Sequence, residues 1–165
     1  MKRKFFIVFL ALWGLLIFFF SSQSYSEQNF TPYLTVLLGD SNLDNVLSHI
    51  QFTYAGREIS VSNLGVVHFI EFFIRKAAHL FVFFVLGSLS WLVSTRVWKS
   101  KKIAAIVAAL FVFLYASLDE FHQHYTNGRS ALVEDVLLDT CGGILGIVTY
   151  IVVFRIYSVK KDENK

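Results

Sequence analysis

The sequence predicts an all-α membrane protein: a polytopic bundle of four transmembrane helices with a small segment between the first two. Two observations lead to this fold class. Apolar residues make up 55% of the 165 positions and charged residues only 16%, whereas soluble domains carry about 25% charged residues. Four stretches are also apolar over roughly the 20 residues that a helix needs to cross a bilayer. The composition therefore excludes an ordinary soluble globule, and a single Cys excludes a disulfide scaffold.

The four spans belong to one domain. We expect them at about residues 5–22, 75–97, 103–120 and 134–156 of a domain that covers 1–165. The first follows three basic residues, as a secretory signal would, but its apolar core exceeds the usual length of about 7–15 residues. No Ala-x-Ala cleavage site follows it. The sequence therefore favours a retained helix.

The segment between the first two spans, residues 23–65, is the only long polar stretch. Within it, residues 51–54 and 58–61 alternate polar and apolar side chains and are rich in β-forming types. Ala55-Gly56-Arg57 joins them, so we expect a short β-hairpin. Residues 66–74 then carry the pattern of a helix that lies in the membrane interface ahead of the second span.

Basic residues fix the expected orientation. Of the 15 Lys and Arg residues, 11 fall on the face that holds both termini and the loop between the second and third spans. They are Lys2, Arg3, Lys4, Arg96, Lys99, Lys101, Lys102, Arg155, Lys160, Lys161 and Lys165. Because basic loops stay in the cytoplasm, we expect both termini there and residues 23–65 outside.

Ionisable and hydrogen-bonding side chains gather at the opposite ends of the second, third and fourth spans. Such groups cost about 2.5–3.5 kcal/mol each at the centre of a membrane, so we expect them to face the bundle and to pair. The residues of this candidate pocket, for catalysis or binding, are Arg75, His79, Asp119, Glu120, Gln123, Arg129 and Asp135, with Lys76 and Asp139 as further ligand-binding positions.

Helical spacing indicates which of these groups share a face. Glu71, Arg75 and His79 repeat every four residues, and Asp119 lies four residues before Gln123. The three residues of the second span are therefore expected to share one face of their helix, and on the third span Asp119 is expected to share a face with His122 and Gln123.

Asp135 and Asp139 also share a face, where two like charges repel. A cation should offset them, and Arg75, Lys76 and Arg129 are the available ones. We expect Arg75 or Arg129 to fill that role.

Two other interpretations of the polar groups compete with a pocket. The network could serve only to hold four short helices together. It could also bind a metal through Asp119, Glu120, His122, His124, Asp135 and Asp139. The sequence contains no H-E-x-x-H pattern, and histidines two residues apart lie on different faces of a helix. We therefore expect neither a metal nor another cofactor.

Small residues in the fourth span point to close helix packing. Gly142 and Gly146 form a small-x-x-x-small pattern, which lets two helices approach each other closely. Cys141 has no partner cysteine in the sequence and is expected to be inert.

The chain resembles the VanZ-like family of small bacterial membrane proteins. The resemblance rests on Phe20-Ser21-Ser22-Gln23, Arg75-Lys76-Ala77-Ala78-His79, Asp119-Glu120-x-x-Gln123 with Gly128-Arg129, and Asp135-Val136 with Gly142 and Gly146. It implies a four-helix protein of the bacterial plasma membrane and a founding member tied to low-level teicoplanin resistance. It implies no particular reaction. Asp139 stands where Asn is frequent in the family, which adds a negative charge.

These expectations lead to one main functional hypothesis. An outward-facing pocket binds or modifies an anionic envelope component, either a membrane lipid or a lipid-linked cell-wall intermediate, and no nucleic acid. Whether it catalyses stays open; if it does, His79 or Glu120 is the candidate base. The alternative is a non-catalytic interaction protein whose polar cluster is structural. Oligomeric state is not predicted.

The orientation is testable by cysteine labelling. A Cys introduced at Ser41, in the 23–65 segment, should be blocked by a membrane-impermeant reagent in intact cells, because the basic residues hold the opposite face in the cytoplasm. Blocking that appears only after the membrane is permeabilised would show the reverse orientation.

Overall fold

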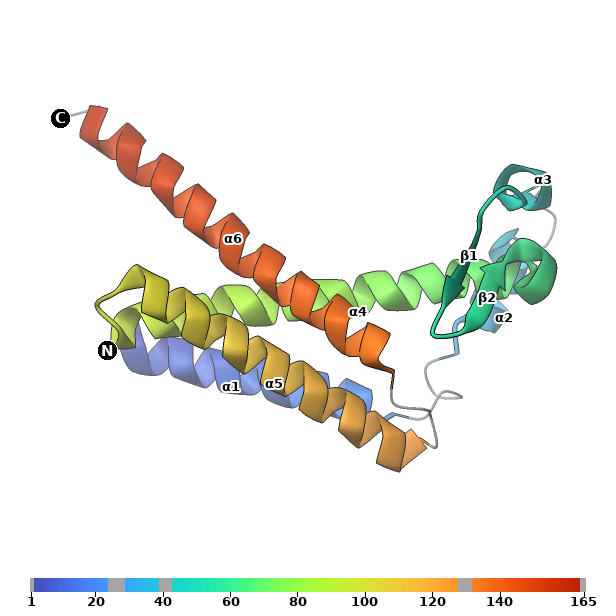
Figure 1. The fold of residues 1–165 in the computed structure, drawn as a ribbon, viewed down its shortest axis with the longest axis horizontal. Coiled ribbons are helices and arrows are strands. Elements are labelled where there is room, and N and C mark those ends of the chain that lie inside the picture. The colour runs from blue at the N-terminus through green and yellow to red at the C-terminus, as the bar shows by residue number, and fades with distance from the viewer. Residues whose placement is uncertain (1, 24–28, 39–42, 128–131, 164–165) are drawn as a thin grey trace.

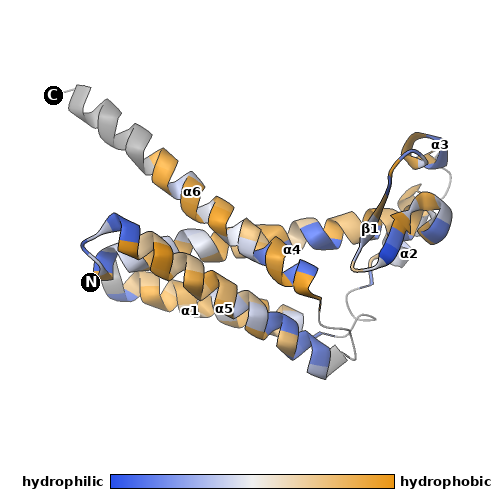
Figure 2. Ribbon diagram, in the orientation of Figure 1, coloured by the Kyte–Doolittle hydropathy of each residue, from blue (hydrophilic) through white to orange (hydrophobic). Residues whose placement is uncertain are grey.

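Four long apolar helices dominate the fold, as the sequence predicted. The structure is a computed structural model and describes residues 2–23, 29–38, 43–127 and 132–163. Each long helix contains a window long and apolar enough to cross a membrane, so the chain is a multi-pass membrane protein. Figure 2 shows apolar residues along these helices and polar residues near their ends. The four are α1 (Lys2–Ser21), α4 (Val61–Val97), α5 (Lys101–Asn127) and α6 (Val133–Glu163).

Four small elements gather at one end of α4, far from both chain termini (Figure 1). We call this the hairpin end. It holds α2 (Thr31–Leu38), α3 (Leu43–Leu47) and a hairpin of β1 (Gln51–Tyr54) and β2 (Arg57–Ser60). The two short helices were not anticipated, because neither is long enough to show a helical period in the sequence.

The predicted hairpin is present, with its second strand starting one residue earlier than expected. The strands are antiparallel, with Tyr54 opposite Arg57 and Gln51 opposite Ser60. The two loop residues both have positive φ, 49° at Ala55 and 73° at Gly56. This is the backbone that a two-residue hairpin turn requires, and Gly adopts it without strain.

The hairpin leads directly into α4. The Ser60 hydroxyl accepts a hydrogen bond from the backbone N–H of Asn63 (3.2 Å) and caps the helix. The backbone leaves helical geometry at Gly65 (φ 74°) and then continues without a break to Val97. Residues 66–74, which were expected to form a separate interfacial helix, are thus part of α4. The helix that contains the second span is therefore longer than the predicted 75–97.

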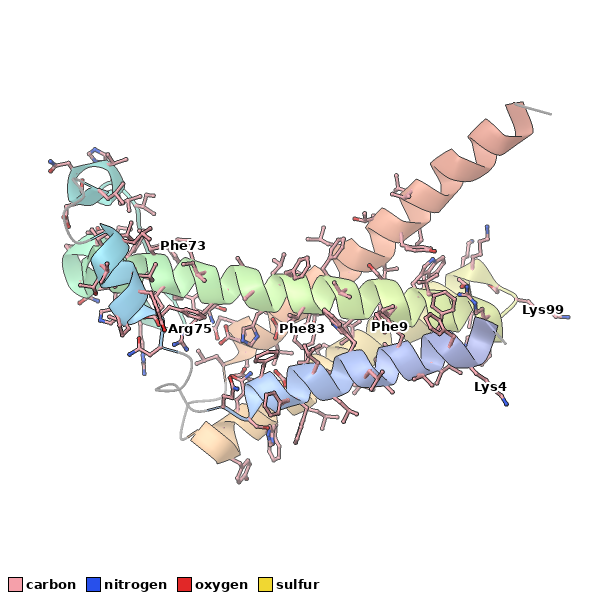
Figure 3. All side chains as sticks on the ribbon, turned by 180° about the vertical axis from the view of Figure 1, so that it is seen from behind. Lys4, Phe9, Phe73, Arg75, Phe83 and Lys99 are labelled. Carbon is pink, nitrogen blue, oxygen red and sulfur yellow. The ribbon has the colours of Figure 1, made fainter. Side chains whose placement is uncertain are left out.

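The apolar core lies where three of the long helices meet. Phe83 and Leu86 of α4 are fully buried against Ile17 of α1 and Val112 of α5. Figure 3 shows Phe83 between α4 and α1. Cross-helix hydrogen bonds add to this packing, because the Trp13 indole donates to the carbonyl of Val82 (2.9 Å). Membrane helices depend on such close packing, since lipid offers no hydrophobic gain between helices.

Glycines bring α4 and α6 into backbone contact. A Cβ placed at Gly87 would lie 2.0 Å from the carbonyl oxygen of Gly143, and one at Gly146 would lie 2.0 Å from that of Phe84. Ser88 also donates across the crossing to the carbonyl of Gly146 (3.2 Å). The close approach expected of the small-residue pattern is present, and no other residue type fits at these positions.

Replacing one of these glycines should loosen the bundle. Gly146→Ala is expected to cost about 1–3 kcal/mol of stability, because the new methyl group meets backbone that cannot move aside. The measurement is the thermal midpoint of the purified protein in detergent. Leu145→Ala, at an exposed neighbouring position, is the control and should change the midpoint little. Equal midpoints for the two variants would contradict this view of the crossing.

Candidate functional site

A cavity of about 420 Å³ lies at the hairpin end, between α1, α4, α5 and the start of α6. Leu16, Ile17 and Phe20 of α1 form part of its apolar wall. Phe30, Ile74, Ala78 and Val82 are also apolar, and the other lining residues are polar or charged. Six of the nine site residues predicted from sequence line it: Arg75, Lys76, His79, Asp119, Gln123 and Asp135.

Two of the other three predicted residues, Glu120 and Asp139, do not line the cavity. Glu120 is buried outside the cavity lining, where its carboxylate accepts a hydrogen bond from the backbone N–H of Leu132 (2.8 Å). It thereby ties the end of α5 to the chain entering α6. Asp139 is buried one helical turn below Asp135. Arg129 lies outside the described residues.

Lys76 and Asp135 form the ion pair nearest the hairpin. The Lys76 ammonium contacts the Asp135 carboxylate, and the hydroxyl of Tyr54 donates to the same oxygen. The ammonium also lies 4.7 Å from the centre of the Tyr54 ring, within cation–π range. Burial and the neighbouring Asp135 carboxylate raise the pKa of Tyr54. The hydroxyl therefore keeps its proton and continues to donate.

Sequence reasoning did not find Tyr54 as a site residue. The only sequence feature that marks Tyr54 is its position as the last residue before the hairpin turn. The strand register does not show that this end of the hairpin contacts α6.

Arg75 contacts a carboxylate on its own helix. Its guanidinium lies 3.2 Å from Glu71, one turn earlier on α4, and Glu71 is only 1% exposed. Glu71 also accepts hydrogen bonds from the Thr31 hydroxyl (3.1 Å) and the Phe30 backbone N–H (3.3 Å), which fix the start of α2. Figure 3 shows Arg75 beside α2.

The prediction that Arg75 is the partner of the two α6 acids is therefore corrected, while Arg129, the other expected partner, lies outside the described residues. We expected Arg75 or Arg129 to offset Asp135 and Asp139. Among the described residues Lys76 contacts Asp135 and His79 contacts Asp139, while Arg75 contacts Glu71. Neighbouring residues of a helix point about 100° apart, so one step along α4 decides which side chain faces α6.

The deepest polar groups come from three helices. His79 Nδ1 of α4 lies 3.4 Å from Asp139 Oδ2 of α6, and the Gln123 amide donates to Asp119 Oδ2 within α5 (3.0 Å). One ligand atom from each of His79, Asp119 and Asp139 lies within 4.8 Å of the other two. His122 lies apart from this group, because it hydrogen-bonds to Ser22 and stacks on Phe18.

Residues from each of the four motifs that carried the resemblance line this cavity. Phe20, Ser21 and Gln23 line it from the end of the first span, opposite the residues of α4, α5 and α6 described above. The VanZ/LLP1 family profile matches residues 6–155, which include all four candidate spans except the first residues of α1. The chain belongs to the VanZ/LLP1 family. No curated protein and no solved structure matches it.

The cavity of this VanZ/LLP1 protein combines cationic donors with acids in a half-enclosed setting. Arg75 and Lys76 can donate to a phosphate or carboxylate, and the His79 imidazole can donate or accept a hydrogen bond. The carboxylates orient these groups. The arrangement suits recognition of an anionic group carried by an apolar tail, which the wall of α1 would contact.

The Lys76–Asp135 pair should show strong energetic coupling. Lys76→Met and Asp135→Asn should each destabilise the protein, and their combined effect should fall short of the sum by about 1–3 kcal/mol, because either change alone leaves the other charge without its partner. Thermal or chemical unfolding in detergent measures the cycle. The same cycle of Lys76 with the exposed neighbour Glu134 (Glu134→Gln) is the control and should be additive. Additivity in both cycles would contradict a stabilising pair.

Proposed function

We propose that this VanZ/LLP1 protein binds an anionic component of the cell envelope in the cavity at the hairpin end, and that this end faces outward. The component is a lipid head group or a lipid-linked cell-wall intermediate. The observation that carries the proposal is the composition of the lining: apolar side chains of α1 face Arg75 and Lys76 across one cavity. A ligand with a charged head and an apolar tail matches both walls.

Both cations are partly exposed at the cavity. The side chains of Arg75 and Lys76 are 17% and 22% exposed, so they reach the cavity while contacting Glu71 and Asp135. A carboxylate that already contacts a guanidinium orients its planar donors, and a phosphate oxygen can accept from those that point to the cavity. Because the guanidinium is already ordered before the ligand arrives, binding loses less side-chain entropy.

If the protein also modifies its ligand, His79 is the better placed base. It lines the cavity, whereas the Glu120 carboxylate accepts from the Leu132 backbone outside the lining. Removal of a proton by His79 would fit acid/base-assisted transfer or hydrolysis at the head group. A change in the envelope of this kind would lower susceptibility to glycopeptides such as teicoplanin.

The ion pairs also support a second candidate, a non-catalytic interaction protein. Lys76 and His79 of α4 each contact a carboxylate of α6, as expected of groups that hold helices together. Function would then reside in the 23–65 segment and its envelope partner. The two candidates differ in what a change at Arg75 does, since Arg75 contacts a carboxylate on its own helix.

A binding screen tests the main proposal. Purified wild-type protein should retain phosphatidylglycerol or a polyprenyl-diphosphate-linked sugar over phosphatidylcholine, as measured by mass spectrometry of co-purified and added lipid. Arg75→Gln should weaken retention at least about 10-fold, the effect of losing one charge-assisted hydrogen bond of about 1.5–3 kcal/mol. Arg57→Gln, on the exposed hairpin, is the matched control and should bind as wild type does.

The conservative variants separate the two candidates. Arg75→Lys and Asp119→Asn should remain folded in detergent yet lose binding if the cavity is a ligand site. Wild-type glycopeptide susceptibility and wild-type lipid retention in both variants would reject the pocket and favour the structural role.

A further inference from the structure

Below the two cations, three possible metal ligands converge from three different helices. We propose that His79, Asp119 and Asp139 form a binding site for one divalent transition-metal cation, of the Mn²⁺ or Zn²⁺ class. The ligand atoms of the three lie within 4.8 Å of one another. Donors about 2.1 Å from one cation lie up to about 4.2 Å apart, so small side-chain rotations bring all three to bonding distance.

One oxygen of Asp139 supplies an independent reason for a ligand. The residue is 3% exposed, and its Oδ1 is buried with no hydrogen-bond partner among the described residues. Only Oδ2 contacts His79, at 3.4 Å. A buried carboxylate oxygen left without a donor costs free energy, which structures avoid by pairing it or by binding a cation. A cation among the three residues would supply that missing partner.

The local charge also favours a cation. Asp119 and Asp139 bring two carboxylates within 4.8 Å of each other in a buried setting, where like charges repel strongly. The nearby Lys76 ammonium contacts a different acid, Asp135. Gln123 donates to Asp119 and His79 contacts Asp139, and a divalent cation held by His79, Asp119 and Asp139 would balance the two carboxylates.

The ligand types select the kind of metal. One imidazole and two carboxylates form a mixed nitrogen and oxygen set, which suits Mn²⁺ and Zn²⁺ better than the all-oxygen sets of Ca²⁺ or the water-rich sets of Mg²⁺. The Gln123 amide, which donates to Asp119 Oδ2 at 3.0 Å, would orient that ligand from outside the metal. His79 was not among the metal ligands considered from the sequence, where it lies 40 residues before Asp119.

Three protein ligands leave coordination positions open to the cavity. His79 and Asp119 line it together with Arg75 and Lys76, so an anionic head group would meet the metal and both cations at once. This last step rests on the function proposed above. The metal site itself does not, since it requires only the three side chains.

Metal binding is measured with the metal alone. The full-length protein, purified in detergent with a tag that contains no histidine and stripped with a chelator, is dialysed against Mn²⁺ or Zn²⁺, and bound metal is counted by mass spectrometry. We expect saturation at one equivalent per chain and a rise in the thermal midpoint. His79→Gln and Asp139→Asn should each weaken binding at least 10-fold. Glu134→Gln and His124→Gln, at exposed positions of the same end, are matched controls and should bind as wild type does.

The outcomes separate this proposal from the previous one. Absence of saturable binding near one equivalent in the wild-type protein overturns the metal site, whether or not any variant folds. Equal binding by wild type, His79→Gln and Asp139→Asn overturns it as well. Metal binding without lipid retention leaves the site standing and rejects the anionic ligand, whereas lipid retention without metal binding does the reverse.

Discussion

The glycine crossing between α4 and α6 is the constraint on which the polar site depends. Without Cβ atoms at Gly87 and Gly146, the two backbones approach to van der Waals contact. That close approach brings Lys76 and His79 of α4 within reach of the α6 acids. Lys76 contacts Asp135, and His79 contacts Asp139. If each glycine carried a side chain, the helices would have to move apart, and the distances from Lys76 and His79 to the acids of α6 would lengthen.

Much of this arrangement was predictable because membrane depth orders residues in one dimension. Hydropathy located the four long helices, and the alternation around Gly56 located the hairpin. The same depth argument placed six of the nine candidate site residues at one cavity. These features depend on the depth of each residue in the membrane, and the position of a residue within an apolar span predicts that depth.

What the sequence did not reveal depends on rotation and on contacts between distant elements. Arg75 and Lys76 have the same depth and charge, and only the rotation of α4 decides that Lys76 faces Asp135. The contact of Tyr54 with α6 depends on how the hairpin folds over the bundle. Glu71 appeared to be an interfacial residue, because its polar partners near Thr31 belong to a helix too short to leave a pattern.

The long separation of the paired residues along the chain has a consequence for biogenesis. Lys76 and Asp135 are 59 residues apart, and His79 and Asp139 are 60 apart. Because ribosomes deliver the chain from its N-terminus, α4 is synthesised with its polar groups before the acids that pair with them exist. The last helix supplies both acids, so the partners of Lys76 and His79 arrive only when α6 is made. Translation that stops before Asp135 therefore leaves Lys76 without the carboxylate that it contacts in the full chain.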